Sequence, residues 1–331
     1  MSRFVGILVA VLFAGGFWLA TAQTNRFDQP VPVPTHPMGS YQPPTTPEIE
    51  LAPEATQALS PASPVEASSV ETPVYKAASS VKQGEVLRVT ITDPGGSVEG
   101  GKAYLAGRDA QVFKDSSEGR YFALASVDVY QKPGGYKLAV QNAKGETLYT
   151  QPVEIIDPKY PTQNIRVTGS TAGLKPLPGE LEAVGALKTR LTQTRFWEEP
   201  FISPTTDCQN SLFGVKRLHN GKPSDDYHKG VDLKSPSGRP IRATNAGVVV
   251  ISKMYRLHGG TVGLDHGQGV TSIYIHMSKM LVKEGDSVKK GDIIGHVGST
   301  GFATGPHLHW GLYVSGIPVN PHQFVSGVPR C

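Results

Sequence analysis

Short β-like runs separated by turn residues recur from Lys76 almost to the end of this chain. Between residues 76 and 157, apolar and polar residues alternate in runs such as 86–91, 121–125, 136–140 and 153–156, and Asp-Pro-Gly-Gly or Pro-Gly-Gly sequences separate several of them. A period of two between such turns is typical of strands. Several short strands in about 80 residues indicate an immunoglobulin-like β-sandwich. It has no cluster of potential catalytic groups, so we expect a spacer or docking module.

The region before the sandwich resembles an export signal followed by a linker. Residues 1–22 combine a basic start, the apolar run 4–13 and an Ala20–Thr21–Ala22 cleavage site, as in a signal peptide. An uncleaved membrane anchor is the alternative, because residues 4–22 approach spanning length. Residues 23–75 are rich in proline and poor in large apolar residues, which predicts a disordered linker. We therefore expect an exported protein, in the periplasm rather than fully secreted.

A connector at residues 158–200 is predicted to contain one amphipathic helix. Its apolar residues recur at helical spacing, which predicts a helix over about 180–195. The apolar stripe should lie against one of the two domains. The residues of the stripe are Leu181, Val184, Leu187 and Leu191.

The C-terminal domain is expected at residues 201–325, with a tail at 326–331. Its flanks hold the only cysteines, Cys208 and Cys331. In an oxidising compartment a disulfide closing the domain is the first interpretation, and a thiolate metal ligand is the alternative. The net charge of +4 fits contact with an anionic polymer such as a cell wall and is too small to indicate nucleic acid.

Nine of the ten histidines lie in this C-terminal domain, and two of them form a His-x-His pair. In a strand, His307 and His309 would project from the same face, with Cα atoms roughly 6.6 Å apart. One could bind a metal while the other transfers protons beside it. Two strand histidines with ordinary hydrogen bonds are the alternative.

A second motif, His228–Lys229–Gly230–Val231–Asp232, offers an imidazole and a carboxylate. Gly230 and Val231 disfavour a helix, while in a straight strand His228 and Asp232 would be roughly 13 Å apart. If both bind one ion, the backbone must bend between them, which Gly230 permits. Two histidines and one carboxylate around zinc, with an open position for water, are typical of a catalytic site.

These two motifs together resemble the lysostaphin-type zinc endopeptidases, also called LytM-domain proteins, which cleave peptide cross-links in bacterial cell walls. The resemblance covers about residues 201–324. It implies a C-terminal antiparallel β-sheet or open-barrel domain, so the expected fold class is mainly β. It continues through the motifs at 211–214, 246–249, 265–267, 274–276, 285–292 and 298–301.

Carried over residue by residue, the resemblance implies one Zn²⁺ bound by His228, Asp232 and His309. It implies His276 and His307 as the catalytic histidines. One would take a proton from water activated by the metal and the other would stabilise the oxyanion, in an assignment that the sequence leaves open. Tyr227 and Tyr274 are near the motifs in sequence only, and neither aligns with the tyrosine of some family members. We expect supporting or packing roles for the other conspicuous residues, which are His219, His258, His266, His296, His322 and Trp310.

The function expected from this resemblance is zinc-dependent hydrolysis of peptide cross-links or stem peptides of peptidoglycan. A catalytically silent LytM-type module that binds the wall and activates a separate amidase is the alternative, although silent relatives lack some of the five residues present here. A secreted metallopeptidase acting on proteins is a third possibility. The expected partner is peptidoglycan, with no nucleic acid and no stable membrane insertion after signal cleavage. A cell-envelope protein is a candidate partner of the sandwich.

Overall fold

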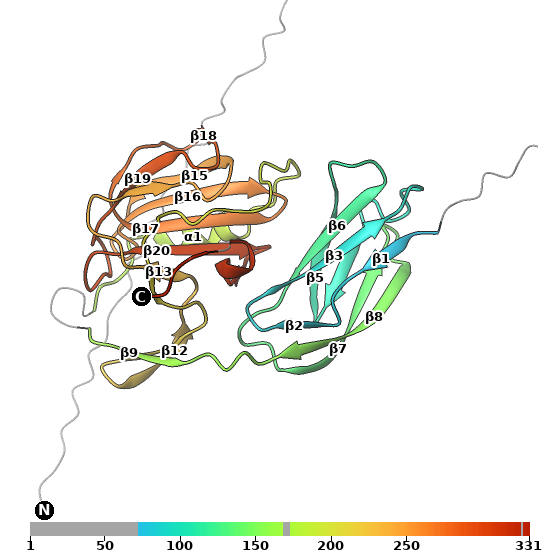
Figure 1. Cartoon of the computed structure of the whole chain (residues 1–331), viewed down its shortest axis with the longest axis horizontal. Coiled ribbons are helices and arrows are strands. Elements are labelled where there is room, and N and C mark those ends of the chain that lie inside the picture. Colours follow the sequence, from blue (N-terminus) through green and yellow to red (C-terminus); the bar gives the residue numbers. More distant parts are fainter. Residues whose placement is uncertain (1–71, 168–172, 326) are drawn as a thin grey trace, which may run out of the picture. The chain divides into compact units, whose positions relative to one another are not determined.

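The computed structural model describes residues 72–167, 173–325 and 327–331. The predicted signal peptide and almost all of the proline-rich linker lie outside these residues. In the described part of the chain, no helix is both long enough and apolar enough to span a membrane. The described fold is mainly β, as predicted (Figure 1).

The N-terminal strands form two layers joined by one shared strand. One layer has the order β1-β3-β6-β5 and the other β4-β7-β8-β2, and β5 pairs with both β6 and β4. Alternate residues such as Leu87, Val89, Leu138 and Val140 are buried in one core between the layers. The predicted sandwich is therefore present. Its strands are β1 (Val74–Lys76), β2 (Ser80–Lys82), β3 (Val86–Thr92), β4 (Lys102–Leu105), β5 (Arg108–Lys114), β6 (Arg120–Ser126), β7 (Gly134–Gln141) and β8 (Thr147–Ile156).

The C-terminal domain is built on a ten-stranded sheet. Its main path has the order β10-β13-β20-β17-β16-β15-β18, and all pairings along it are antiparallel. The part of the path from β13 to β18 can be followed in Figure 1. Strand β19 pairs with β14 and β17, and β21 pairs with β20. The strands are β10 (Gln209–Ser211), β13 (Val231–Leu233), β14 (Pro240–Arg242), β15 (Gly247–Met254), β16 (Gly260–Gly267), β17 (Val270–Met280), β18 (Ser287–Val288), β19 (Ile293–Val297), β20 (Leu308–Val314) and β21 (Ile317–Val319), followed by the 3₁₀ turn η2 (Pro321–Gln323).

A small three-stranded sheet connects the two regions of the chain. Strand β9 (Thr162–Ile165) runs parallel to β11 (Lys216–His219), and β11 forms a hairpin with β12 (Lys222–Tyr227). The hairpin leads directly into the His228 motif, so the connector contributes one strand beside the segment that carries the predicted metal ligands.

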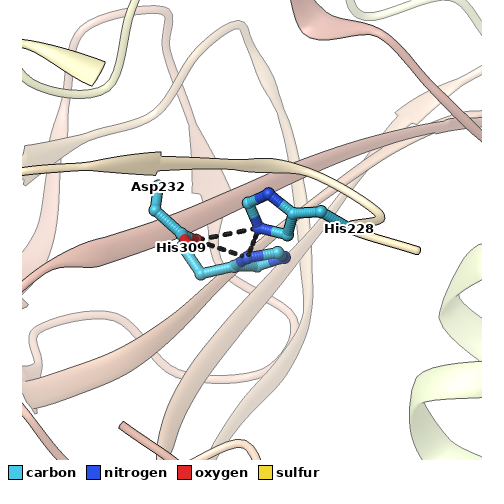
Figure 2. A group of neighbouring side chains, drawn as sticks. All are labelled: His228, Asp232 and His309. Atoms are coloured by element: carbon cyan, nitrogen blue, oxygen red, sulfur yellow. Dashed lines mark hydrogen bonds and ion pairs between the residues drawn. The ribbon is translucent and has the colours of Figure 1, made fainter. Parts of the chain in front are cut away.

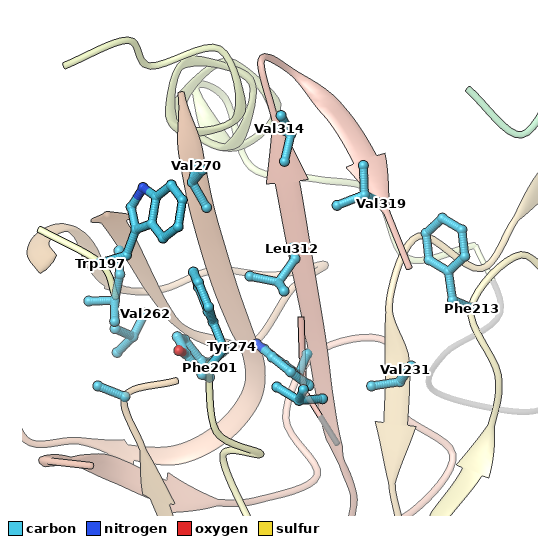
Figure 3. Close-up of a cluster of buried hydrophobic side chains, with 14 of the residues drawn as sticks. Trp197, Phe201, Phe213, Val231, Val262, Val270, Tyr274, Leu312, Val314 and Val319 are labelled. Carbon is cyan, nitrogen blue, oxygen red and sulfur yellow. The ribbon is translucent and has the colours of Figure 1, made fainter. Parts of the chain in front are cut away.

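The core of the C-terminal domain lies under its central strands. Figure 3 shows part of this core, where Leu312 and Val314 of β20 lie beside Val270 and Tyr274 of β17. Trp310 is fully buried, which confirms the packing role predicted for it. The central strands therefore pack beside β20, the strand that carries His309 of the site described below.

The connector helix is shorter than the sequence pattern predicts. Helix α1 comprises Glu180–Lys188 and does not extend to residue 195. Val184 and Leu187 are buried against the sheet, but Leu181 and Leu191 are exposed. The chain leaves the helix because Thr192 and Arg190 hydrogen-bond to the buried carboxylate of Asp265, which fixes this segment in a non-helical conformation.

The two cysteines form a disulfide with a Cα–Cα separation of 5.1 Å. Cys331 also donates a backbone hydrogen bond to Gln209, so the C-terminal end lies along β10. The predicted pairing of Cys208 with Cys331 is therefore present, and it ties the end of the chain to the strand next to β13.

Candidate metal centre

Asp232 and His309 lie directly opposite each other on neighbouring strands. The register of β13 and β20 pairs these two residues, and Oδ1 of Asp232 is 2.9 Å from Nδ1 of His309. Directly opposed residues of an antiparallel pair have the closest side chains on one face of the sheet. The strand pairing thus brings together two groups from distant parts of the sequence.

His228 approaches the same point from the turn before β13. A side chain at Gly230 would collide with the backbone oxygen of Trp310 and would lie 2.8 Å from Nε2 of His309. Gly230 does not have a positive φ. The glycine is therefore required because the turn lies so close to β20 that no side chain fits. The sequence pattern predicts a glycine that permits a bend, whereas the structure shows that the missing side chain is what matters.

The ring of His228 is oriented by the strand on its other side. Its Nδ1 is 2.8 Å from the carbonyl oxygen of Leu212 and 3.1 Å from Oγ of Ser211. A carbonyl can only accept, so Nδ1 carries the proton and Nε2 has a free lone pair. This Nε2 lies 2.9 Å from Oδ1 of Asp232 and 2.9 Å from Nδ1 of His309, as Figure 2 shows.

The three side chains fit a bound cation. Their ligand atoms all lie within 4.8 Å of one another. The side chain of His228 is 0% exposed, that of Asp232 13% and that of His309 12%. Buried nitrogen lone pairs and a carboxylate facing one another repel unless a proton or a metal ion lies between them. Two imidazoles and one carboxylate form a donor set that zinc accepts.

Protonation states at this point favour metal binding. Burial lowers the pKa of His309 to about 4, although Asp232 acts in the opposite direction. Burial would raise the pKa of Asp232, but His228 and His309 outweigh it and hold this pKa well below its usual range. A neutral imidazole and an ionised carboxylate are the forms that ligate metals.

Arg217 of β11 contacts the second oxygen of Asp232, and the sequence motifs do not indicate this contact. Its Nη2 lies 3.4 Å from Oδ2. The guanidinium therefore holds one carboxylate oxygen while the other faces the two histidines. No spacing rule links Arg217 to Asp232, because the contact depends on how the β11–β12 hairpin folds back.

His276 and His307 form a second pair beside the first group. Their ring centroids are 4.8 Å apart, and the His276 ring is 6.4 Å from the ring of His309. Nδ1 of His276 donates to the carbonyl of Thr300 at 2.8 Å, and Nδ1 of His307 donates to the carbonyl of Gly305 at 2.8 Å. Both rings consequently have Nε2 as the nitrogen with a free lone pair.

His276 is held in an unusual state. Burial, with smaller contributions from His307 and His309, lowers the pKa of His276 to about 3. Its backbone φ is 65°, in the left-handed region that bulky residues rarely adopt. The pairing of β16 with β17 shifts register between Gly260 and Val262, opposite the segment that contains His276. The side chain of His276 therefore does not follow the regular alternation of side chains between the two faces of the sheet. A neutral imidazole is thus held close to the candidate metal centre.

Four of the remaining histidines of the C-terminal domain, and the two tyrosines near the motifs, have partners elsewhere. His266 hydrogen-bonds to Ala246 and Ser272, and Tyr274 accepts a hydrogen bond from the backbone of Thr244. Tyr227 packs against Phe213. These contacts are those of a buried structural network. The other partners are Phe302 for His219, Glu180 for His258 and Gln209 for His322.

Comparisons with known proteins match part of the chain. The family model described as "Peptidase family M23" matches residues 226–321. Peptidoglycan DD-endopeptidase ShyA of Vibrio cholerae is 41% identical over 125 residues, which are 37% of this chain and 29% of that protein. DD-carboxypeptidase/endopeptidase Mpg of Neisseria meningitidis is 43% identical over 121 residues, which are 37% of this chain and 28% of that protein. The matched segment thus spans less than a third of either relative.

A solved structure is also similar to part of the chain. The catalytic domain of the antimicrobial peptidase lysostaphin from Staphylococcus simulans has 34% sequence identity. The match covers 36% of this chain and 92% of that chain, with a TM-score of 0.32.

Proposed function

Because residues 226–321 form a domain of peptidase family M23, we propose that this protein is a zinc-dependent endopeptidase that hydrolyses stem peptides or peptide cross-links of bacterial peptidoglycan. The observation that carries the proposal is the convergence of His228, Asp232 and His309 next to the His276–His307 pair. The relative from Vibrio cholerae, which is named a peptidoglycan DD-endopeptidase, supports the substrate class.

We assign the metal to Nε2 of His228, Nδ1 of His309 and Oδ1 of Asp232. Zinc, when bound, supplies Lewis acidity that polarises the scissile carbonyl and lowers the pKa of water. Ser211 and Leu212 fix the tautomer of His228, and Arg217 restrains the outer oxygen of Asp232. Such outer partners keep metal ligands in one orientation.

His276 and His307 are assigned to the proton transfers and to the oxyanion. Each ring has its Nδ1 hydrogen-bonded to a backbone carbonyl, so Nε2 is the nitrogen that remains for proton transfer. A neutral imidazole at this position accepts the proton of the attacking water and returns it to the leaving amine. The partner ring, when protonated on Nε2, stabilises the oxyanion by a hydrogen bond.

The silent wall-binding module is not favoured, because all five residues are present in the chain and lie close to one another. We propose export to the periplasm, since peptidoglycan lies outside the cytoplasmic membrane. The signal peptide at residues 1–22, the linker at 23–75 and an envelope partner of the sandwich belong to the same proposal.

The decisive test uses purified peptidoglycan sacculi. Wild-type protein should release muropeptides, and their masses identify the cleaved bond. Asp232→Ala should lose zinc and reduce release by about 1,000-fold, as expected when several kcal/mol of charge stabilisation are removed. His296→Ala, outside the proposed site, is the matched control. Sacculi binding without released muropeptides, unchanged by Asp232→Ala, would support the silent module.

A further inference from the structure

Glu180 is a fully buried carboxylate at the start of the connector helix, outside the family domain. Its exposed fraction is 0%, although it lies in the first turn of α1, where an acidic residue is ordinarily solvated. Burial of a charge is costly unless the charge is fully hydrogen-bonded. Glu180 therefore needs hydrogen-bond donors inside the fold.

The carboxylate accepts hydrogen bonds from one loop of the family domain, residues 256–258. Oε1 accepts hydrogen bonds from the backbone N–H of Leu257 at 2.9 Å and of His258 at 2.9 Å, and from Nδ1 of His258 at 2.7 Å. Oε2 accepts from the N–H of Arg256 at 3.2 Å and of Leu177 at 2.8 Å. Desolvation opposes ionisation, but the hydrogen bonds from Leu177, Leu257 and His258 outweigh it and lower the pKa of Glu180 to about 2.

This loop in turn holds His276. The carbonyl of His258 accepts the backbone N–H of His276 at 3.0 Å, and the carbonyl of Leu257 accepts the N–H of Phe302 at 2.8 Å. Phe302 lies two residues after Thr300, whose carbonyl accepts a hydrogen bond from Nδ1 of His276 at 2.8 Å. The backbone and the ring of His276 therefore both depend on the loop that Glu180 binds.

The fit between the two loops is close. A side chain at Gly259 would collide with Thr300, and one at Gly301 would collide with the backbone of Gly259. There is no spare room between the loops, so a shift of one loop must move the other.

The backbone of His276 needs such support. A residue with a side chain at φ 65° is strained and persists only when its surroundings over-determine it. We propose that Glu180 is a positioning residue that, through Leu257 and His258, fixes the backbone and ring of His276 in the geometry required for hydrolysis. This inference rests on the proposed function for its kinetic consequence, although the geometry can be measured without it.

A purely structural role is the competing interpretation. Val184 and Leu187 already attach α1 to the sheet by apolar contacts. If Glu180 only added to this attachment, its loss would lower stability without changing the turnover of the molecules that remain folded and loaded with zinc.

The experiment compares Glu180→Gln and Glu180→Ala with Glu182→Gln, an exposed acidic residue of the same helix turn. Turnover of muropeptides is expressed per bound zinc, and KM is measured separately. In Glu180→Ala, kcat should fall by about 100-fold, the order of loss that follows a 1 Å misplacement. KM should change by less than about twofold, because substrate binding is not touched. Glu180→Gln should retain more activity, since its amide oxygen can still accept from Leu257 and His258. Equal kcat per zinc in Glu180→Ala and wild type would overturn the inference.

A spectroscopic arm separates this inference from the proposed function. The Nδ1–H proton resonance of His276, assigned by comparison with His276→Ala, reports its hydrogen bond to Thr300. It should shift or broaden in both Glu180 variants and stay unchanged in Glu182→Gln. An unchanged resonance in both Glu180 variants overturns the inference even if the enzyme is active. A wild-type protein that releases no muropeptides would instead contradict the proposed function, and the resonance would still test the positioning. If Glu180→Ala does not fold, Glu180→Gln carries both measurements.

Discussion

Oδ1 of Asp232 and Nδ1 of His309 lie 2.9 Å apart at directly opposed positions of β13 and β20, although the residues are 77 positions apart in sequence. Strand β13 has only three residues. A register slip of one residue would turn Asp232 to the opposite face. The candidate centre therefore depends on the pairing that Val231 and Leu233 secure from within the core.

Substitution of His309 and substitution of His307 should have different effects on zinc binding. His309→Ala should lose the metal, because the imidazole that faces His228 and Asp232 is removed. His307→Ala should retain most of the zinc and lose turnover by about 100- to 10,000-fold, the contribution typical of an acid–base group. Zinc content by mass spectrometry and muropeptide release provide the two readouts. Loss of zinc in His307→Ala would show that this division of roles is wrong.

Ser211→Ala should weaken zinc binding without abolishing it. Its hydroxyl lies 3.1 Å from Nδ1 of His228, but the carbonyl of Leu212 still holds that nitrogen. We expect a decrease in zinc affinity of about 10-fold, the low end for residues that orient a metal ligand. Competition with a chelator measures it. Ser252→Ala, whose hydroxyl bonds to the backbone of Val282, is the control. Equal affinities in Ser211→Ala and the control would argue against an orienting role.

Removal of the Cys208–Cys331 disulfide should destabilise the folded protein. The bond closes a loop with a sequence separation of 123 residues, so the unfolded chain gains freedom when it is lost. We expect Cys208→Ser with Cys331→Ser to lower the free energy of unfolding by about 2–4 kcal/mol. Denaturant unfolding of the oxidised wild type and the double variant checks this. A midpoint unchanged by the double substitution would contradict the expectation.

Stability should fall with decreasing pH partly because of His266. Burial lowers the pKa of His266 to about 4, below its value of about 6.5 in the unfolded chain. Between these values the unfolded state binds one more proton, so stability is complete above pH 6.5 and decreases as pH falls toward 4. Thermal unfolding between pH 7 and 4 in the presence of chelator should show a smaller slope in His266→Asn than in wild type. Parallel slopes would exclude His266 as the source.

Much of the secondary structure was predictable from local patterns. Residues 86–91 and 136–140, where apolar and polar residues alternate, lie in strands β3 and β7. Such alternation favours a strand with one buried face, independently of the strand's neighbours. The predicted helix over 180–195 is longer than α1, because a local sequence pattern contains no information about contacts with residues far away in the sequence. Asp265 holds Arg190 and Thr192 outside the helix.

Local spacing and composition were enough to predict the β-rich class and the residue types of the candidate site. Alternation along a strand places His307 and His309 on one face, and nine of the ten histidines lie beyond residue 201. Which distant groups meet depends on the three-dimensional path of the chain. Asp232 meets His309 through strand register, Arg217 reaches Asp232 from a hairpin, and Glu180 supports His276 through a loop. Such contacts follow from the path of the backbone in space, and one-dimensional spacing carries no information about that path.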